Sequence, residues 1–167
     1  MDTATSSDDW ERWLAANAGR FLLYARERTA SEADAEDVLQ EALVEAWERT
    51  PEQRMPDAAL VFATIRRRAL DLLRARQRRL RREQVASSDY EVAWFYSALE
   101  DAETRSMLEH SVRGLPDILR EVVTLRIWGG LTFAQIAETM GCPLNTAASR
   151  YRSGIEALRQ RLKGALT

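Results

Sequence analysis

The sequence predicts an all-α protein made of two small helical domains joined by a linker. Its 167 residues include only 7 glycines and 4 prolines, which favours long helices over a chain of tight turns. Apolar residues recur every three to four positions along most of the chain, as on one face of an α-helix. Residues 83–93 lack this periodicity and contain a pair of serines, which is typical of a linker. We therefore expect domains over residues 8–82 and 97–167, with the linker over 83–96.

Three helices are predicted before the linker, and each begins near a side chain that can cap its first turn. Their expected ranges are 8–28, 31–49 and 57–82. The clearest signal is Ser31, which is followed three residues later by Asp34 in a capping pattern. Asp57 offers a cap for the third helix.

Four shorter helices are predicted after the linker. Their expected ranges are 97–113, 116–128, 132–140 and 145–163. Pro116 suits a first helical turn, and Thr132 with Gln135 forms a capping box. Asn145 is expected to cap the last helix, after a turn made by Gly141 and the three residues that follow it.

The composition argues against several classes of function. A single cysteine, Cys142, excludes an internal disulfide and a CxxC metal site, and a single histidine, His110, argues against a multi-histidine metal centre or a histidine relay. We therefore expect no enzymatic activity, no metal and no cofactor. The longest apolar run, residues 58–63, is far shorter than the ~20 residues that span a bilayer. With no secretory signal in the acidic N-terminus, we expect a cytoplasmic protein without membrane insertion.

Charge is distributed along the chain in blocks. Residues 1–53 hold 13 acidic and 5 basic side chains, residues 54–82 hold 2 and 10, residues 83–121 hold 9 and 3, and residues 122–167 hold 2 and 6. The blocks therefore carry −8, +8, −6 and +4, although the whole chain carries only −2. Two basic blocks separated by an acidic one indicate two places where a polyanion can bind.

The second predicted helix has an acidic face opposite an apolar one. The apolar positions are Ala35, Leu39, Ala42, Leu43 and Ala46, and the acidic ones are Asp34, Asp37, Glu41, Glu45 and Glu48. Like charges at this spacing repel one another. A stripe of one sign therefore suggests a basic protein partner, with a solubilising face as the alternative.

The third predicted helix likewise has an apolar face opposite a charged one, but its charges are mainly basic. Its expected buried face is Phe62, Ile65, Ala69, Leu72, Leu73 and Leu80, and the opposite face carries Arg67, Asp71, Arg74, Arg78 and Arg82. Backbone phosphates are the natural counterpart of so many arginines on one helix. The alternative is a solvated helix neutralised by the acidic helix before it.

Residues 132–163 have the outline of a helix-turn-helix. The expected core stripe of the last helix is Leu144, Ala147, Tyr151, Ile155, Leu158 and Leu162. The opposite arc carries Asn145, Thr146, Ser149, Arg152 and Ser153, small and polar residues that suit a helix entering a major groove.

These segments together resemble bacterial RNA polymerase sigma factors of the extracytoplasmic-function (ECF) type, in the sigma-70 family. The stretch AEDVLQEALVEAW (35–47) is similar to the part of sigma region two that binds core polymerase. VFATIRRRALDLLRARQRR (61–79) is similar to the adjoining part that melts and reads the minus-10 element. Residues 115–162 resemble region four, which binds the minus-35 element.

The resemblance implies three groups of binding residues and no catalytic one. Core polymerase would be bound by Asp34, Asp37, Gln40, Glu41, Glu45 and Glu48. Minus-10 DNA would be bound by Arg67, Asp71, Arg74, Arg78 and Arg79. Minus-35 DNA would be bound by Asn145, Thr146, Ala148, Ser149, Arg150, Arg152 and Ser153. The implied partners are core RNA polymerase, promoter DNA and a separate anti-sigma protein.

The chain departs from the family pattern at a few of these positions. The family often has a basic residue where this chain has Ala148, and another near Ser153. Base readout in the minus-35 element is then expected to rest more on Ser149, Arg150 and Arg152. The family often has Asn where this chain has Arg67, which suggests a phosphate contact in place of a base contact.

Two other functions remain open at this point. A helix-turn-helix regulator that acts without polymerase would leave the acidic stripe unexplained, and it would tolerate reversal of Asp37 and Glu41 to lysine. A helical protein-interaction module would use the basic helix to bind an acidic partner, and it would bind no DNA at any salt concentration.

Overall fold

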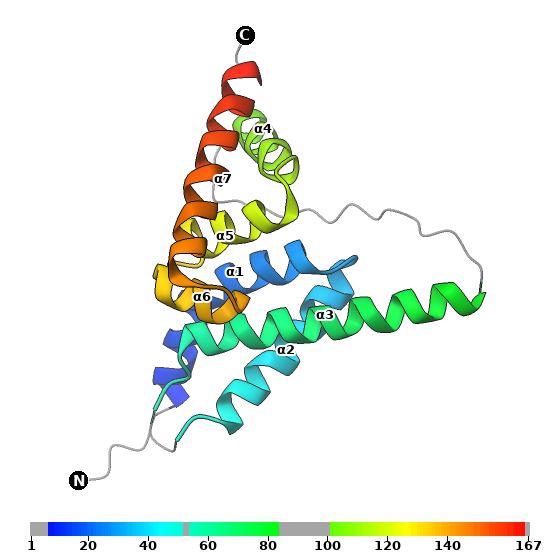
Figure 1. Ribbon diagram of the computed structural model, residues 1–167. Helices are drawn as coiled ribbons and strands as arrows, with labels where there is room; N and C mark the ends of the chain where they lie inside the picture. The colour runs from blue at the N-terminus through cyan, green and yellow to red at the C-terminus, as the bar shows by residue number, and fades with distance from the viewer. Residues whose placement is uncertain (1–6, 52–53, 84–100, 166–167) are drawn as a thin grey trace. The chain divides into compact units, whose positions relative to one another are not determined.

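The computed structural model describes residues 7–51, 54–83 and 101–165. Within these ranges the chain forms seven α-helices and no strand, which confirms the all-α prediction (Figure 1). The helices fall into two compact units, Met1–Val92 and Ala93–Thr167. Apart from Glu83, which ends a helix, the predicted linker lies outside the described residues.

The first unit is a bundle of three helices, each packed against the other two. They are α1 (Ser7–Arg28), α2 (Glu32–Glu48) and α3 (Ala58–Glu83). The predicted caps are present: the Ser31 hydroxyl accepts a hydrogen bond from the backbone nitrogen of Asp34 at 3.1 Å, and Asp57 Oδ1 accepts one from the nitrogen of Ala59 at 3.0 Å. These bonds satisfy backbone donors that the first turn of a helix leaves without partners.

Aromatic rings form the centre of this bundle. The Phe62 ring of α3 meets Phe21 and Tyr24 of α1 edge-on, with centroids 5.0 and 5.5 Å apart, and all three side chains are fully buried. Edge-to-face aromatic pairs add to the stability that burial itself provides. The small residues Ala35, Ala42 and Ala46 line the buried face of α2, which allows it to approach the other two helices closely.

The C-terminal part of α3 extends beyond the bundle, and the predicted buried face is wrong there. Leu72 and Leu73 are 38% and 47% exposed, and Leu80 is partly exposed. The reason is length, since 26 residues of α3 span ~39 Å whereas the 17 residues of α2 span ~26 Å. Figure 1 shows the green end of α3 projecting past α1 and α2.

The second unit has four helices, with α7 packed against the other three. They are α4 (Ala102–Arg113), α5 (Asp117–Ile127), α6 (Phe133–Met140) and α7 (Leu144–Ala165). The core is aliphatic, and its fully or almost fully buried members are Val112, Leu115, Val122, Val123, Leu125, Leu131 and Ile136. α7 and α5 approach closely at Gly154, because a Cβ atom on this residue would stand 2.6 Å from Val123 Cγ2.

The starts of α4 and α5 differ from the prediction. α4 begins at Ala102 rather than near residue 97, because the Asp101 carboxylate caps it by accepting hydrogen bonds from the nitrogens of Glu103 and Thr104 at 3.2 and 3.0 Å. Pro116 lies one position before α5, at the cap rather than in the first turn. Both differences move an expected boundary without changing the order of the helices.

None of the helices in the described ranges has a stretch that is long and apolar enough to cross a bilayer. The seven helices form two packed bundles, and each bundle has its own core.

Candidate functional surfaces

The first candidate surface is the outer face of α2. Of the residues predicted to bind a partner there, Asp37, Gln40, Glu41 and Glu48 are exposed, whereas Asp34 and Glu45 are partly buried. The buried stripe of α2 runs through Ala35, Val38, Ala42 and Ala46. Leu39 and Leu43, which were predicted as core, lie at its edge and are only partly buried.

Two apolar side chains stand in the middle of this acidic face. Val44 is 59% exposed and Trp47 is 46% exposed. The Trp47 ring meets the ring of Trp10 edge-on at 5.0 Å, and Trp10 stacks on Trp13 at 5.2 Å. Two aromatic side chains of α1 therefore hold the exposed tryptophan in place. An apolar centre with a charged rim is the usual anatomy of a protein-protein interface. We call Asp37, Gln40, Glu41, Val44, Trp47 and Glu48 the α2 surface.

Sequence reasoning missed Val44 as part of this surface. The signal was present, because Val44 lies four residues after Gln40 and three before Trp47 and so shares their face of the helix. Trp47, at 46% exposure, suits an interface rather than the core of the bundle.

Glu45 is not a member of the exposed surface, because arginines of α3 hold its carboxylate. Arg67 donates a hydrogen bond to Oε1, and Arg68 donates to Oε2 from Nη2 at 3.0 Å and from Nε at 3.3 Å. Arg68 also pairs with Glu41 at 2.9 Å. Thus Glu45 and Arg67, which were predicted for two different surfaces, form one bridge between α2 and α3.

The bridge has an electrostatic consequence for both helices. Hydrogen bonding by Arg67 is the main cause that lowers the pKa of Glu45, while partial burial acts in the opposite direction. The hydrogen bond with Glu45 likewise raises the pKa of Arg68. The interpretation of α3 as neutralised by its acidic neighbour is therefore correct for Arg67 and Arg68, at the end of α3 that lies within the bundle.

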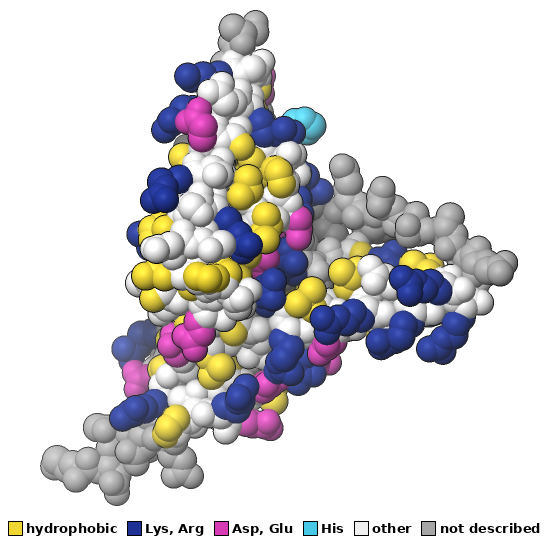
Figure 2. Space-filling view, viewed as in Figure 1, with side chains coloured by type: hydrophobic (Ala, Val, Ile, Leu, Met, Phe, Trp, Pro, Cys, Tyr) yellow, Lys and Arg dark blue, Asp and Glu magenta, His cyan; other side chains and the backbone are white. Residues whose placement is uncertain are grey.

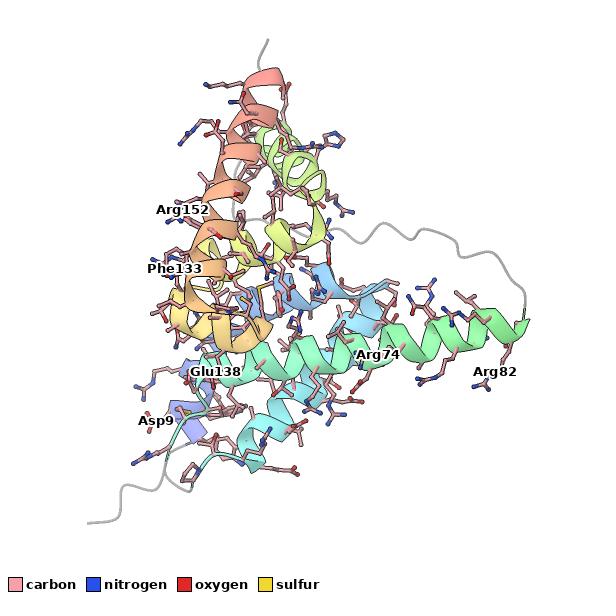
Figure 3. The ribbon with its side chains drawn as sticks, viewed as in Figure 1. Asp9, Arg74, Arg82, Phe133, Glu138 and Arg152 are labelled. Atoms are coloured by element: carbon pink, nitrogen blue, oxygen red, sulfur yellow. The ribbon has the colours of Figure 1, made fainter. Side chains whose placement is uncertain are left out.

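The second candidate surface is the projecting part of α3. Its arginines are exposed except for Arg76, which is partly buried, and Figure 2 shows basic side chains spaced along this arm. Figure 3 labels Arg74 and Arg82 on it. Local acids neutralise some of this charge, since Arg74 lies 3.6 Å from Asp71 and Arg79 lies 3.1 Å from Glu83. We call Arg74, Arg76, Arg78, Arg79, Arg81 and Arg82 the α3 arm.

The third candidate surface is formed by α6 and α7, which have the geometry of a helix-turn-helix. The predicted capping box is present: Gln135 N donates to Thr132 Oγ1 at 3.2 Å and Thr132 N donates to Gln135 Oε1 at 2.9 Å. Gly141 ends α6 in a left-handed conformation, with φ of 64°, which glycine adopts without strain. The Phe133 ring packs between Tyr151 of α7 at 5.4 Å and the guanidinium of Arg126 at 4.6 Å.

The turn is one residue shorter than predicted, which changes the start of α7. The helix begins at Leu144, and the Pro143 carbonyl accepts a hydrogen bond from Ala147 N at 3.1 Å. Asn145 is therefore a residue of the first helical turn rather than its cap. Leu144, predicted as core, is 52% exposed, because the core stripe of α7 starts at Ala147.

The residues predicted to contact DNA on α7 separate into two groups by exposure. Asn145, Ser149, Arg152 and Ser153 are exposed, while Thr146, Ala148 and Arg150 are partly buried. The Ser149 hydroxyl donates to the Thr146 carbonyl at 3.0 Å. Figure 3 shows Arg152 projecting away from α4 and α5.

Metal binding finds no support in the described parts of the chain. No group of three or more histidine, cysteine, aspartate or glutamate side chains is arranged there to hold a metal ion. The three surfaces are instead suited to binding macromolecules, one through apolar and acidic side chains and two through basic or polar ones.

Comparisons with known proteins match both units. A family model described as Sigma-70 region 2 matches residues 13–79, and one described as Sigma-70, region 4 matches residues 105–158. The RNA polymerase sigma-H factor of Pseudomonas aeruginosa is 32% identical over 145 residues, which cover 80% of this chain and 75% of that protein. The ECF RNA polymerase sigma-E factor of Haemophilus influenzae is 29% identical over 149 residues, covering 81% and 78%.

Solved structures show the same fold. The sigma factor RpoE from Bartonella quintana, solved in complex with the anti-sigma factor NepR, matches with a TM-score of 0.76 and 21% identity, covering 93% of this chain and 98% of that one. CnrH, solved in complex with the cytosolic domain of CnrY, matches with a TM-score of 0.58 and 20% identity, covering 96% and 91%.

Proposed function

Since the chain belongs to the sigma-70 family of RNA polymerase sigma factors and is an alternative sigma factor of the ECF type, we propose that each of its three surfaces binds a different partner during promoter recognition. The α2 surface binds core RNA polymerase, the α3 arm binds minus-10 DNA, and α7 binds minus-35 DNA. In this assignment the region-two domain covers residues 8–82 and the region-four domain covers residues 97–167, with the linker over 83–96. The protein itself catalyses no reaction.

The observation that carries the polymerase assignment is the apolar centre of the α2 surface. Val44 and Trp47 are more than two-fifths exposed in the middle of an acidic rim, although apolar burial would favour hiding them. Large apolar side chains that lie together on a surface mark a binding site. Their partner on core polymerase is expected to be basic at its rim and apolar at its centre, because complementary charges favour encounter and fix the register.

The assignment of the α3 arm to DNA rests on its charge and its position. The arm stands clear of the other helices of its unit, so its arginines are available to phosphates on more than one side. Arg78 and Arg82 are exposed and make no ion pair within the described residues. Arg67, by contrast, is bound to Glu45 and belongs to the α2–α3 bridge in the free protein. Its proposed role on minus-10 DNA therefore requires the bridge to open.

Two further parts of the proposal follow from the family. An anti-sigma protein is a proposed partner, because the similar solved structure of the sigma factor RpoE contains it in complex with the anti-sigma factor NepR. The proposed location is the cytoplasm, where core polymerase and promoter DNA are found.

Charge reversal on the α2 surface tests the polymerase assignment. The pair Asp37→Lys and Glu48→Lys is preferable to a change at Glu41, because Glu41 pairs with Arg68 and its reversal would disturb the bundle. Core polymerase labelled with a fluorophore is titrated with the full chain. We expect the double variant to bind at least tenfold more weakly, with the thermal unfolding temperature of the free protein unchanged.

Arg159→Ala serves as the control for this titration. Arg159 lies in the other unit and pairs only locally, with Glu156 at 2.8 Å. Its substitution should leave polymerase binding unchanged. Equal binding by the wild type and the double variant would contradict the assignment and favour a regulator that works without polymerase.

A further inference from the structure

In the N-terminal half of α7, two exposed side chains have a forked pattern of hydrogen-bonding groups. This half presents Leu144, Asn145, Ser149, Arg152 and Ser153 to solvent. A serine carries one short hydroxyl, whereas the carboxamide of Asn145 and the guanidinium of Arg152 each present two groups in a fixed plane. Planar pairs of groups are what the edges of bases in the major groove require.

Asn145 is available for such a contact because it is not the cap of the helix. α7 begins one residue earlier, so the Asn145 side chain leaves the first turn as an exposed helical residue. Its carboxamide has no hydrogen-bond partner among the described residues. A capping asparagine would instead direct its oxygen back to the nitrogens of the first turn.

Arg152 is likewise available, and it differs in this from Arg150 and Arg159, its neighbours along α7. It is exposed and makes no ion pair within the described part of the chain. Arg159, two turns later, is held by Glu156 at 2.8 Å. Arg150 is partly buried at the edge of the packed face, and its neighbour Tyr151 packs on Phe133.

We infer that Asn145 and Arg152 are the two residues that read sequence in the minus-35 duplex, Asn145 against an adenine and Arg152 against a guanine. This rests on the proposed function, in which α7 enters the major groove. The carboxamide matches the donor at N6 and the acceptor at N7 of adenine, and the guanidinium donates to O6 and N7 of guanine. Both contacts come from the N-terminal half of the second helix, where a helix-turn-helix meets base edges.

The spacing of the two residues sets the distance between the two bases. Asn145 and Arg152 are seven residues apart, which is about 10.5 Å along the helix axis. Base pairs in duplex DNA are stacked about 3.4 Å apart. Because a helix in the major groove is inclined to the DNA axis, the adenine and the guanine are expected at most about three base pairs apart.

Glu156 marks the C-terminal limit of the part of α7 that is expected to contact bases, which we call the reading surface. It lies on the same exposed arc, one turn after Arg152, and hydrogen bonding by Gln160 and the charge of Arg159 lower its pKa. A carboxylate is repelled by phosphates, so α7 is expected to leave the groove before this residue. The reading surface thus covers the first three turns of the helix.

The test uses the full chain bound to core polymerase, with a library of duplexes randomised over the minus-35 region. Bound duplexes are sequenced for the wild type and for Asn145→Ala, Arg152→Ala and Arg159→Ala. We expect Arg152→Ala to lose discrimination for guanine at one position by roughly 5- to 150-fold, and Asn145→Ala to lose a preference for adenine at another position no more than about three base pairs away. Arg159→Ala should reproduce the wild-type preferences.

The outcomes separate this inference from the proposed function. If the wild type selects a sequence and both variants select the same one, the inference is overturned while the sigma function stands. If Arg152→Ala weakens binding to every sequence equally, Arg152 contacts phosphate and the inference is also overturned. If the wild-type complex selects no sequence, the assignment of α7 to promoter DNA fails and the inference fails with it. Loss of folding is excluded by equal unfolding temperatures, which we expect because both side chains are exposed.

Discussion

Replacing Glu45 by Gln is expected to weaken the bridge between α2 and α3 and to lower the stability of the first unit. The change removes the charge that Arg67 and Arg68 hydrogen-bond while keeping the size of the side chain. Hydrogen bonds to a desolvated charge are worth about 1.5–3 kcal/mol each, but exposed ion pairs are worth only about 0.2–1 kcal/mol. The Glu45 side chain is 18% exposed, while those of Arg67 and Arg68 are 51% and 36% exposed, so solvent screens the pairs.

We therefore expect a loss of about 1 kcal/mol for the two pairs together. For a unit of this size, such a loss lowers the unfolding temperature by about 4–8 °C. Thermal unfolding followed by far-UV circular dichroism measures the change, and amide hydrogen exchange locates it in α2 and α3. Glu48→Gln is the matched control, because Glu48 is exposed on the same helix and makes no ion pair among the described residues.

The stability that Glu45→Gln loses is expected to decrease as the pH falls. The pKa of Glu45 is lowered in the folded protein relative to its ordinary value of 4.5, so the ionised bridge stabilises the fold above about pH 4.5. This contribution disappears as the pH falls through the lowered pKa. The difference between the wild type and Glu45→Gln should therefore be largest at neutral pH and should shrink on acidification.

A double-mutant cycle with Arg68→Gln isolates the pair itself. We expect the double variant to lose less stability than the sum of the two single losses, because the second substitution costs less once the first has removed the pair. Unfolding temperatures of Glu45→Gln and Glu48→Gln that agree within a degree, together with additive single effects, would refute the reasoning.

Three further predictions concern the other surfaces and the second core. Val44→Asp should weaken binding to core polymerase at least tenfold in the fluorescence titration. The unfolding temperature should not fall, because Val44 is 59% exposed. Unchanged binding would show that the apolar centre of the α2 surface does not contact polymerase. Gly154→Ala should destabilise the second unit by about 1–3 kcal/mol in thermal unfolding, because its Cβ would stand 2.6 Å from Val123 Cγ2. Gly164→Ala, where nothing lies within 4 Å, should cause no loss, and equal effects at the two glycines would contradict the packing. Arg78→Gln should reduce the slope of log affinity for promoter DNA against log salt by about 0.9 in magnitude, whereas an unchanged slope would show that Arg78 contacts no phosphate.

The local signals in the sequence predicted most of the helices. Ser31 with Asp34 and Thr132 with Gln135 are capping patterns that depend only on neighbouring residues, and both appear in the structure as hydrogen bonds. Gly141 is a local signal of the same kind, because the left-handed conformation that ends α6 favours glycine. Such signals are readable because the atoms involved lie within one turn of each other.

Features that depend on the length of neighbouring helices were predicted less well. The stripe of α3 continues with apolar residues to Leu80, but periodicity does not state where α1 and α2 end. Leu72 and Leu73 therefore remain exposed. Leu144 was misplaced for a related reason, because the turn after α6 is one residue shorter than the sequence suggested.

The bridge between α2 and α3 required the packing of the two helices to be known. The sequence indicated that acidic and basic faces exist, and it left open whether they meet. In the structure they meet at Glu41, Glu45, Arg67 and Arg68, while Asp37 and Glu48 of α2 and Arg78 and Arg82 of α3 stay exposed. The position of Val44 at the centre of the α2 surface was readable from helical spacing, but a lone valine gives no signal until its exposure is known.

The central claim is that this chain directs core polymerase to its own set of promoters. The most direct test is transcription of fragmented genomic DNA by purified core polymerase with and without the protein, followed by sequencing of the RNA 5′ ends. We predict new start sites that share two upstream elements at a fixed spacing, one for each DNA-binding surface. The same start sites with and without the protein would contradict the account.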